Sequence, residues 1–379
     1  MYLGPLVLSW SLAILLAATA SAQAVAASPS WALTLRVLES WDSNVRFATP
    51  GGGGDLGSQL DAGVSRAWQF HRGTLRATGD GTETVYRNSR DLNHLTYDLG
   101  IITSYRLSHR ATLNVDDRLL SSYARDVATL TATGLLFPAV LIRTNTAGGT
   151  FAYALSPRTQ IRWELRDDRV SFDSSQFRGA SSLTSRTTMM RQLSRSHALE
   201  IIQEYQYTAS GTENGTIQAL VGAWEGTFAN GLALTAAAGV RAYRLLGRSA
   251  IHLTPSGSLG LKGQFRRRDT LGVQYARTVD QAIGFAQLRM SDVVSLNCSL
   301  SFGTKLGLDF AANYGRSVDP VEQSFRFVGR TGSAEIRYVL IGNLAVVGGY
   351  SFWQRSVAPT PIISSHRSTL SLVHARTWR

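Results

Sequence analysis

Strict alternation between apolar and charged side chains is the feature that most constrains this chain. In the segment QIRWELRDDRVSF (160–172), Ile161, Trp163 and Leu165 alternate with three charged residues, and Asp168 continues the charged row. Successive side chains of a β-strand point to opposite faces, so one face of this segment carries no charge and the other is crowded with it. The segment predicts a strand with an apolar environment on one side and water on the other.

Short polar turns recur along the chain at an almost fixed interval. They are centred on residues 72, 110, 158, 195, 230, 267, 304 and 342, which gives separations of 38, 48, 37, 35, 37, 37 and 38 residues. About ten to thirteen residues with period-two patterning lead into each turn and a similar number leave it, followed by a stretch rich in Gly, Ser, Asn and Asp. Asn230-Gly231 and Gly342-Asn343 are favoured hairpin connections. The repeat therefore predicts eight β-hairpins.

Eight hairpins supply sixteen strands, and segments at about 32–47 and 367–378 bring the total to eighteen. Propeller blades hold four short strands per repeat, whereas this repeat holds two strands that are each long enough to cross a bilayer when tilted. An even strand number, alternating short turns and longer loops, and both ends on the short-turn side are typical of outer-membrane barrels. We predict an all-β, antiparallel transmembrane barrel of about eighteen strands that occupies residues 28–379 as one domain.

The first 27 residues have the pattern of a cleaved secretory signal peptide. Leu6 to Ala18 is an apolar core, and small residues follow it, with cleavage expected between Ala22 and Ala27. The alternative is an N-terminal membrane anchor, for which about thirteen apolar residues are short. The rest of the sequence has no apolar run long enough for a helical span, and its mean hydropathy is −0.04.

Charge and cysteine content narrow the classes of partner and fold. The net charge is +12, and Lys262 and Lys305 are the only lysines. A basic exported protein can meet anionic lipid, an acidic polymer or nucleic acid, and export makes nucleic acid the weakest of these. The single cysteine, Cys298, allows no internal disulfide, which is ordinary for a large sheet protein. We expect outer-membrane lipid to be the main partner.

Extending the alternation along the other strands predicts an inward, water-facing row of charged residues. An eighteen-strand barrel is too wide for side chains to fill, so this row would line an aqueous channel. The residues are either mutually satisfied wall groups or a lining for a polar solute or hydrated polymer. The predicted pore-lining residues are Arg76, Asp80, Asp98, Asp116, Arg118, Arg162, Glu164, Arg166, Asp168, Glu200, Glu204, Asp309, Glu335 and Arg337.

Basic residues in the short turns predict a positive rim at the periplasmic end. Such a rim would contact anionic inner-leaflet phospholipids, or attract an acidic polymer or an acidic docking face. The rim residues are Arg72, Arg110, Arg158, Arg195, Arg266, Arg267, Arg268 and Lys305.

Three local features carry separate expectations. Asp117 falls on the predicted lipid side between Val115 and Leu119, and a β-bulge there would restore the alternation. The segment 126–143, uncharged between its terminal residues, is either a constriction, a cover of the mouth, a contact with another protein, or a continuation of longer strands. Aromatic pairs near strand ends predict interfacial girdles. These pairs are Trp68 and Phe70, Phe151 and Tyr153, Tyr205 and Tyr207, and Phe325 and Phe327.

Catalysis is poorly supported by the sequence. The seven histidines show no metal-ligand spacing, and none stands in a nucleophile motif. We expect no cofactor and no enzymatic activity, although an outer-membrane hydrolase remains an alternative.

The chain resembles a group of β-barrel porins encoded beside exopolysaccharide and capsule loci in Gram-negative bacteria. The likeness rests on the strand ESWDSNVRF (39–47), the glycine-rich loop PGGGGDLGS (50–58) and the repeated long hairpins. It implies an outer-membrane conduit that exports a polysaccharide together with a periplasmic polysaccharide export protein. The carboxyl end, Trp378-Arg379, departs from the usual assembly signal, which finishes on an aromatic residue. The alternatives are a general diffusion porin for small hydrophilic solutes and an adhesin barrel.

Overall fold

The computed structural model describes most of the predicted barrel region. The described residues are 30–46, 53–123, 140–175, 177–210, 213–228, 231–246, 250–265, 269–282, 287–318, 326–357 and 362–378. The predicted signal peptide lies outside these ranges and stays a prediction, as do Arg266, Arg267 and Arg268 of the rim and most of the segment 126–143.

The described chain forms eighteen strands and one short 3-10 helix, η1 (Arg90–Leu92). None of the helical residues in the described ranges belongs to a helix able to cross a membrane. The strands are β1 (Ser30–Asp42), β2 (Asp55–Phe70), β3 (Gly73–Tyr86), β4 (His94–Arg106), β5 (Ala111–Tyr123), β6 (Leu141–Ser156), β7 (Thr159–Phe172), β8 (Ala180–Gln192), β9 (His197–Ser210), β10 (Glu213–Thr227), β11 (Ala233–Leu245), β12 (His252–Gln264), β13 (Thr270–Ala282), β14 (Gln287–Phe302), β15 (Leu306–Val318), β16 (Arg326–Ile341), β17 (Leu344–Val357) and β18 (Ile363–Trp378).

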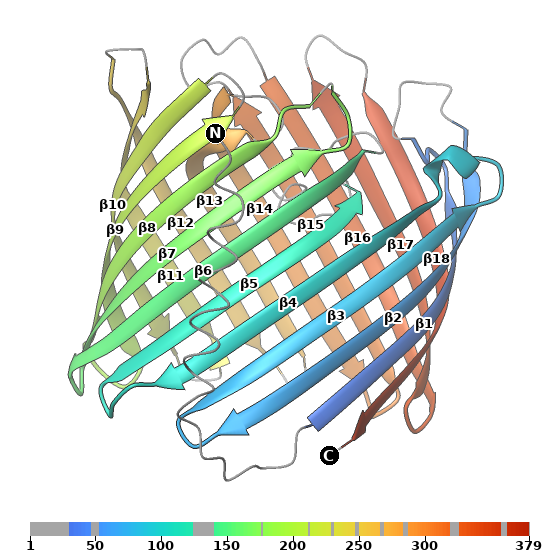
Figure 1. Ribbon diagram of the computed structural model, residues 1–379, viewed down its shortest axis with the longest axis horizontal. Helices are drawn as coiled ribbons and strands as arrows, with labels where there is room; N and C mark the ends of the chain where they lie inside the picture. The colour runs from blue at the N-terminus through green and yellow to red at the C-terminus, as the bar shows by residue number, and fades with distance from the viewer. Residues whose placement is uncertain are drawn as a thin grey trace.

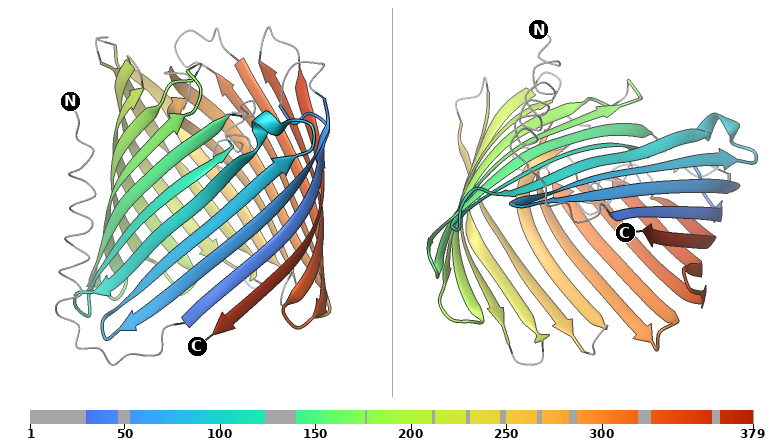
Figure 2. Two further views of the ribbon diagram at one scale, coloured as in Figure 1. Left: turned by 45° about the vertical axis from the view of Figure 1, so that its right-hand side comes forward. Right: turned by 60° about the horizontal axis from the view of Figure 1, so that its bottom comes forward.

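Every strand pairs antiparallel with its neighbours in sequence, and the first strand pairs with the last, so the sheet closes on itself (Figure 1). The closing ladder extends from Trp31–Trp378 to Asp42–Arg367. The two views of Figure 2 show the tilted strands forming a continuous wall. Closure leaves no open sheet edge, which is the condition for placing a sheet in lipid, where unpaired backbone groups are costly.

The short turns lie together at one end of the barrel, where β1 begins and β18 ends (Figure 1). Gly231, Gly303 and Gly342 adopt left-handed φ angles of 73°, 66° and 52° in three of these turns, a conformation that glycine adopts without steric cost. The connections at the other end include the two longest, 43–54 and 124–140. By the usual rule for outer-membrane barrels, the short-turn end is periplasmic and the other end is external.

The strands are longer than the sequence pattern predicts. They contain 13 to 16 residues, because the ladders continue into Gly-, Ser- and Thr-rich stretches that we expected to be loops. Thr208 pairs with Gly215 and Ser210 with Glu213, so only residues 211–212 separate β9 from β10. Small and hydroxyl residues pair here because the neighbouring strand continues alongside them.

The pairing registers assign each strand residue to one of two faces, and the assignment is consistent around the full circle of eighteen ladders except at two register shifts beside short turns, at Ala154–Ser156 and Val339–Ile341. The outer face carries exposed apolar side chains, for example Leu99, Trp163, Leu220, Leu259 and Leu370. Exposed apolar surface on this scale requires a cover, and hydrocarbon supplies it. The inner face is described below.

Two of the local sequence expectations are wrong. The β4–β5 and β5–β6 registers pass through Asp117 without a shift, so the expected bulge is absent. Asp117 instead keeps its outer-face position, where the Nδ2 group of Asn145 donates a hydrogen bond of 2.8 Å to its carboxylate. Phe327 is on the inner face and only 1 % exposed. It lies beneath the guanidinium of Arg289 and therefore contributes to no lipid-facing girdle.

Buried apolar clusters are small and lie near the external end. Ile217, Tyr243 and Val279 form one cluster, and Val45, Tyr86 and Leu92 form another. A wide barrel has no central hydrophobic core, so its stability depends on the closed ladders and on burial of the outer face in lipid.

Candidate functional site on the inner wall

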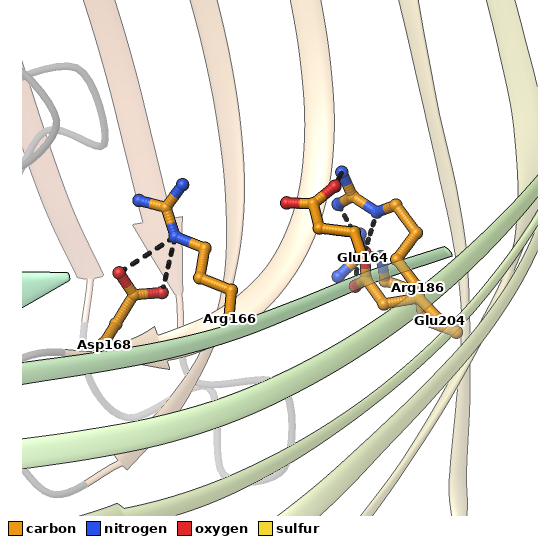
Figure 3. A network of polar contacts seen from close by, with 6 residues as sticks. Glu164, Arg166, Asp168, Arg186 and Glu204 are labelled. Atoms are coloured by element: carbon orange, nitrogen blue, oxygen red, sulfur yellow. Dashed lines mark hydrogen bonds and ion pairs between the residues drawn. The ribbon is translucent and has the colours of Figure 1, made fainter. Parts of the chain in front are cut away.

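The registers place all fourteen predicted pore-lining residues on one face of the sheet, which we call the inner face. They lie on β3 (Arg76, Asp80), β4 (Asp98), β5 (Asp116, Arg118), β7 (Arg162, Glu164, Arg166, Asp168), β9 (Glu200, Glu204), β15 (Asp309) and β16 (Glu335, Arg337). Figure 3 shows five inner-face side chains projecting from β7, β8 and β9 into the interior. The face that bears Arg162 to Asp168 is therefore the one that encloses the lumen.

Charged residues of alternating sign cross the inner wall from β7 to β9 (Figure 3). Glu164 lies directly opposite Arg186 of β8, which in turn lies opposite Glu204 of β9. The Nε atom of Arg186 donates a 2.9 Å hydrogen bond to Glu204, and its Nη1 lies 4.0 Å from the carboxylate of Glu164. Along β7, the Nε of Arg166 is 3.0 Å from both carboxylate oxygens of Asp168.

The same series continues to β11 through the second oxygen of Glu204. The Nη2 atom of Arg241 lies 3.3 Å from that oxygen, and its Nη1 donates a 3.1 Å hydrogen bond to the carbonyl of Val279 on β13. The side chains of Glu204 and Arg241 are 6 % and 12 % exposed. Ions held this far from water require close partners, because desolvation alone is expensive. This part of the wall is consequently fixed in shape.

A second part of the inner wall, on β3 to β5 four strands away, carries more carboxylates than arginines. Asp80 lies directly opposite Asp98, and Asp116 lies opposite Ile102, which is two inner-face positions beyond Asp98 along β4. Arg118 of β5 donates from two nitrogens to the carboxylate of Asp98, with an Nε distance of 2.8 Å. Two arginines, Arg76 and Arg118, accompany three carboxylates on the inner face of these strands, which gives this part of the lumen an excess of negative charge.

A third group lies on β14 to β16. Asp309 and Glu335 are directly opposite, and the hydroxyl of Ser299 donates a 2.6 Å hydrogen bond to Asp309. Arg337 is the next inner-face residue beyond Glu335 on β16. Within the part of the chain that the structure describes, no ion pair includes Arg337, Arg76, Arg162 or Glu200.

Sequence reasoning missed several inner-face ions that the registers reveal. Arg186 and Arg241 join the Glu204 network, and Arg36 lies 4.0 Å from Asp61 where β1 meets β2. Their own strands are rich in Ala, Thr and Ser, so the alternation there is weak. These residues could have been found by assigning the inner face on a neighbouring strand with clear alternation and carrying that assignment across to their own strands.

Five predicted rim residues are described, and all five lie at the short-turn end, in the turns that contain Arg72, Arg110, Arg158, Arg195 and Lys305. Arg106 lies beside Arg72 in a hollow between neighbouring turns, and Arg191 lies beside Arg158 in another. The sequence reading missed Arg106 and Arg191 because both are at strand ends rather than in the turns.

The described residues provide no group of three or more His, Cys, Asp or Glu side chains suited to a metal ion. Several of the charged inner-face groups are paired, either across strands, as Arg186 with Glu204, or along one strand, as Arg166 with Asp168. Their geometry suits electrostatic contact with a passing solute.

No known protein family and no curated protein sequence matches this chain. Solved structures do match it. OccK2 (OpdF) of Pseudomonas aeruginosa superposes with a TM-score of 0.54 at 12 % identity, covering 93 % of this chain and 98 % of that one. OccAB4 of Acinetobacter baumannii superposes with a TM-score of 0.53 at 13 % identity, covering 93 % of this chain and 99 % of that one. OccAB1 of the same species superposes with a TM-score of 0.53 at 11 % identity, covering 95 % of this chain and 99 % of that one.

At identities this low, the likeness establishes the fold alone. The chain shares with these structures the fold of a closed, antiparallel β-barrel, here of eighteen strands. An even number of long antiparallel strands and an apolar outer face are the pattern of barrels that span a membrane.

Proposed function

We propose that this protein is a passive, non-enzymatic outer-membrane channel for small hydrophilic solutes. One observation carries the proposal: a closed eighteen-strand wall with an apolar outer face bears fixed charges of both signs on its inner face. A barrel of this strand number leaves an interior wider than its side chains can fill. Fixed charges of both signs on the inner wall would orient a polar solute and favour its entry over that of apolar compounds.

The structural matches support the small-solute function over the exopolysaccharide conduit expected from the sequence resemblance. Outer-membrane porins align with this chain over nearly their whole length, and the comparisons give no support to a polysaccharide export locus. The mixed charge of the inner wall also suits zwitterionic or singly charged solutes, each of which can find a complementary wall group.

Conductance and solute uptake test the proposal directly. Purified protein reconstituted into planar bilayers should give stepwise, steady conductance without any nucleotide or partner. Proteoliposomes should swell in sugars and amino acids, with a rate that falls as solute size increases. A protein that is folded and inserted but neither conducts nor admits any small solute would refute the channel.

A deletion strain separates the two transport functions. The channel proposal expects slower uptake of small hydrophilic solutes and normal surface polysaccharide. Loss of surface polysaccharide with unchanged solute uptake would instead support the export conduit and a periplasmic export partner.

For the basic rim we propose contact with anionic phospholipids of the inner leaflet. Arg72, Arg110, Arg158, Arg195 and Lys305 lie at the short-turn end, where lipid phosphates are within reach of long side chains. Replacing these five residues with Gln should weaken the retention of the protein in vesicles that contain phosphatidylglycerol. Single-channel conductance should be unchanged.

A further inference from the structure

The outer face of the barrel has a basic hollow near the external ends of β16 and β17. Its volume is about 320 Å³, and its lining residues are Arg326, Val328, Arg330, Gln354, Ser356 and Ile362. Gln354 lies directly opposite Arg330, and Ser356 opposite Val328, so these side chains share the outer face. The hollow is therefore separate from the lumen, and no solute passing through the barrel would meet it.

Three arginines give this region its charge. Arg326 and Arg330 are exposed in the hollow, and Arg316 of β15 lies directly opposite Val328, between them. The carboxylate nearest to them by register is Asp292, opposite Arg316 on β14. Asp292 already contacts Arg277 at 3.6 Å and accepts a 2.9 Å hydrogen bond from the hydroxyl of Tyr275. Within the described residues, the hollow thus has a net positive charge and no acidic lining group.

The guanidinium group of Arg330 is held in position by two neighbouring side chains. Its Nη1 donates a 3.3 Å hydrogen bond to the side-chain oxygen of Gln354, and its guanidinium carbon lies 6.0 Å from the ring centroid of Tyr314. A guanidinium fixed by two neighbours retains further N–H groups for an anion.

From the hollow towards the middle of the strands, the outer face carries aromatic side chains. Tyr314 is opposite Arg330 on one side, and Phe352 and Tyr350 follow Gln354 along β17. Tyr350 and Tyr314 are exposed, as is Ile362 at the edge of the hollow. The outer face here combines arginines at the external end with an apolar, aromatic surface below them, which is the polarity of a lipid with an anionic headgroup.

We propose that this hollow binds a phosphorylated glycolipid of the outer leaflet, with the phosphate on Arg326 and Arg330 and the acyl chains along Tyr314, Tyr350 and Phe352. Phosphate is favoured because arginine pairs with it through parallel N–H donors. Ser356 and Gln354 add neutral donors for phosphate or sugar oxygens. The inference requires the barrel to span the outer membrane but does not depend on which solute crosses the lumen.

The test compares lipids on the purified full-length barrel in detergent by native mass spectrometry. The probes are bisphosphorylated lipid A, the same lipid without its phosphates, phosphatidylglycerol and inorganic phosphate. We expect bisphosphorylated lipid A to bind at least tenfold more tightly than the dephosphorylated form, and inorganic phosphate not to displace it. Equal binding of the dephosphorylated lipid would overturn the proposal. Equal binding of phosphatidylglycerol, or displacement by phosphate, would overturn its assignment to a glycolipid.

Variants locate the binding. Arg326→Gln with Arg330→Gln should lower the affinity for bisphosphorylated lipid A at least tenfold. Arg169→Gln is the matched control, because Arg169 is an outer-face arginine of β7 that is already paired with Asp167 at 2.8 Å. It should leave the affinity unchanged. Unaltered binding by the double variant, with folding confirmed by its gel mobility before boiling, would refute the site. Single-channel conductance should be the same in all three proteins, which separates this test from that of the channel.

Discussion

Asp80 lies directly opposite Asp98 on the inner face of the barrel, in the ladder between β3 and β4. Like charges at directly opposed positions repel, and here the nearest compensation is Arg118, which binds Asp98 from β5. The charge of this carboxylate pair is therefore compensated chiefly by Arg118.

Arg118→Gln should make the channel more selective for cations. The substitution removes one positive charge and leaves Asp98, and Asp80 opposite it, without this cation, so the local potential becomes more negative. Reversal potentials in a KCl gradient should shift towards that of potassium. Because the Arg118 side chain is 60 % exposed, the free energy of unfolding should fall by less than about 1 kcal/mol. An unchanged reversal potential would show that these residues do not lie along the ion path. Arg169→Gln on the outer face is the control.

Glu204→Gln should destabilise the barrel more than any neighbouring charge removal. Glu204 is the shared partner of Arg186 and Arg241 and is 6 % exposed. Loss of this charge leaves Arg241, whose side chain is 12 % exposed, beside a neutral group. Breaking an ion pair so far from water costs about 3 kcal/mol. Urea unfolding in micelles measures the change. Glu164→Gln is the control, since Glu164 lies 4.0 Å from Arg186 and is 31 % exposed, and its effect should stay below about 1 kcal/mol. Similar losses in both variants would contradict the shared-partner role.

Arginine substitutions at two adjacent residues of β12 should differ sharply. Leu259 is on the outer face and 53 % exposed, whereas Ser258 is on the inner face. Leu259→Arg exposes a cation to hydrocarbon and should cost roughly 2 to 4 kcal/mol, and Ser258→Arg should cost little because it faces water. Refolding yield into lipid vesicles and the urea midpoint measure the difference. Equal effects would mean that the two faces are not in different solvents.

Closure of the barrel can be tested by a cross-link. Thr34 of β1 is directly opposite Ala375 of β18, and both are on the inner face. Opposed residues in an antiparallel ladder have Cα atoms about 4.5 to 5.5 Å apart, within the range of a disulfide. In a Cys298→Ser background, Thr34→Cys with Ala375→Cys should oxidise within one chain and increase the mobility of the boiled, non-reduced protein. Thr34→Cys with Thr235→Cys, on distant strands, should not. Dimers alone from the first pair would indicate an open sheet.

The sequence predicts the strand number and the two faces because the solvent enforces both. Water and hydrocarbon sort every second residue, so the row from Arg162 to Asp168 can be assigned without coordinates. Partners across strands cannot be assigned in this way, because they depend on the register between neighbouring ladders. Glu204 meets Arg241 across β10, where Ala219 lies between them in the ladders, and nothing in either segment indicates that distance.

Asp117 and Phe327 depart from the sequence prediction because their surroundings in the barrel are not visible in the local residue pattern. Asp117 remains on the outer face because Asn145 supplies a hydrogen bond, so no bulge is needed. Phe327 has the aromatic character of a girdle residue but falls on the inner row, beneath Arg289. A position in sequence near a strand end does not reveal which face an aromatic ring occupies; only the row parity does.

Away from the two register shifts beside the short turns, the parity of the registers is unbroken, and this restricts how the chain can change over time. A single residue inserted into the middle of a strand would move all residues beyond it to the opposite face of the sheet. Water-facing and lipid-facing positions would be exchanged up to the next turn. Length can therefore vary within a strand only in steps of two, or else in the connections. Natural variants of this barrel should accordingly place their odd-numbered insertions and deletions at the two rims and leave the wall uninterrupted.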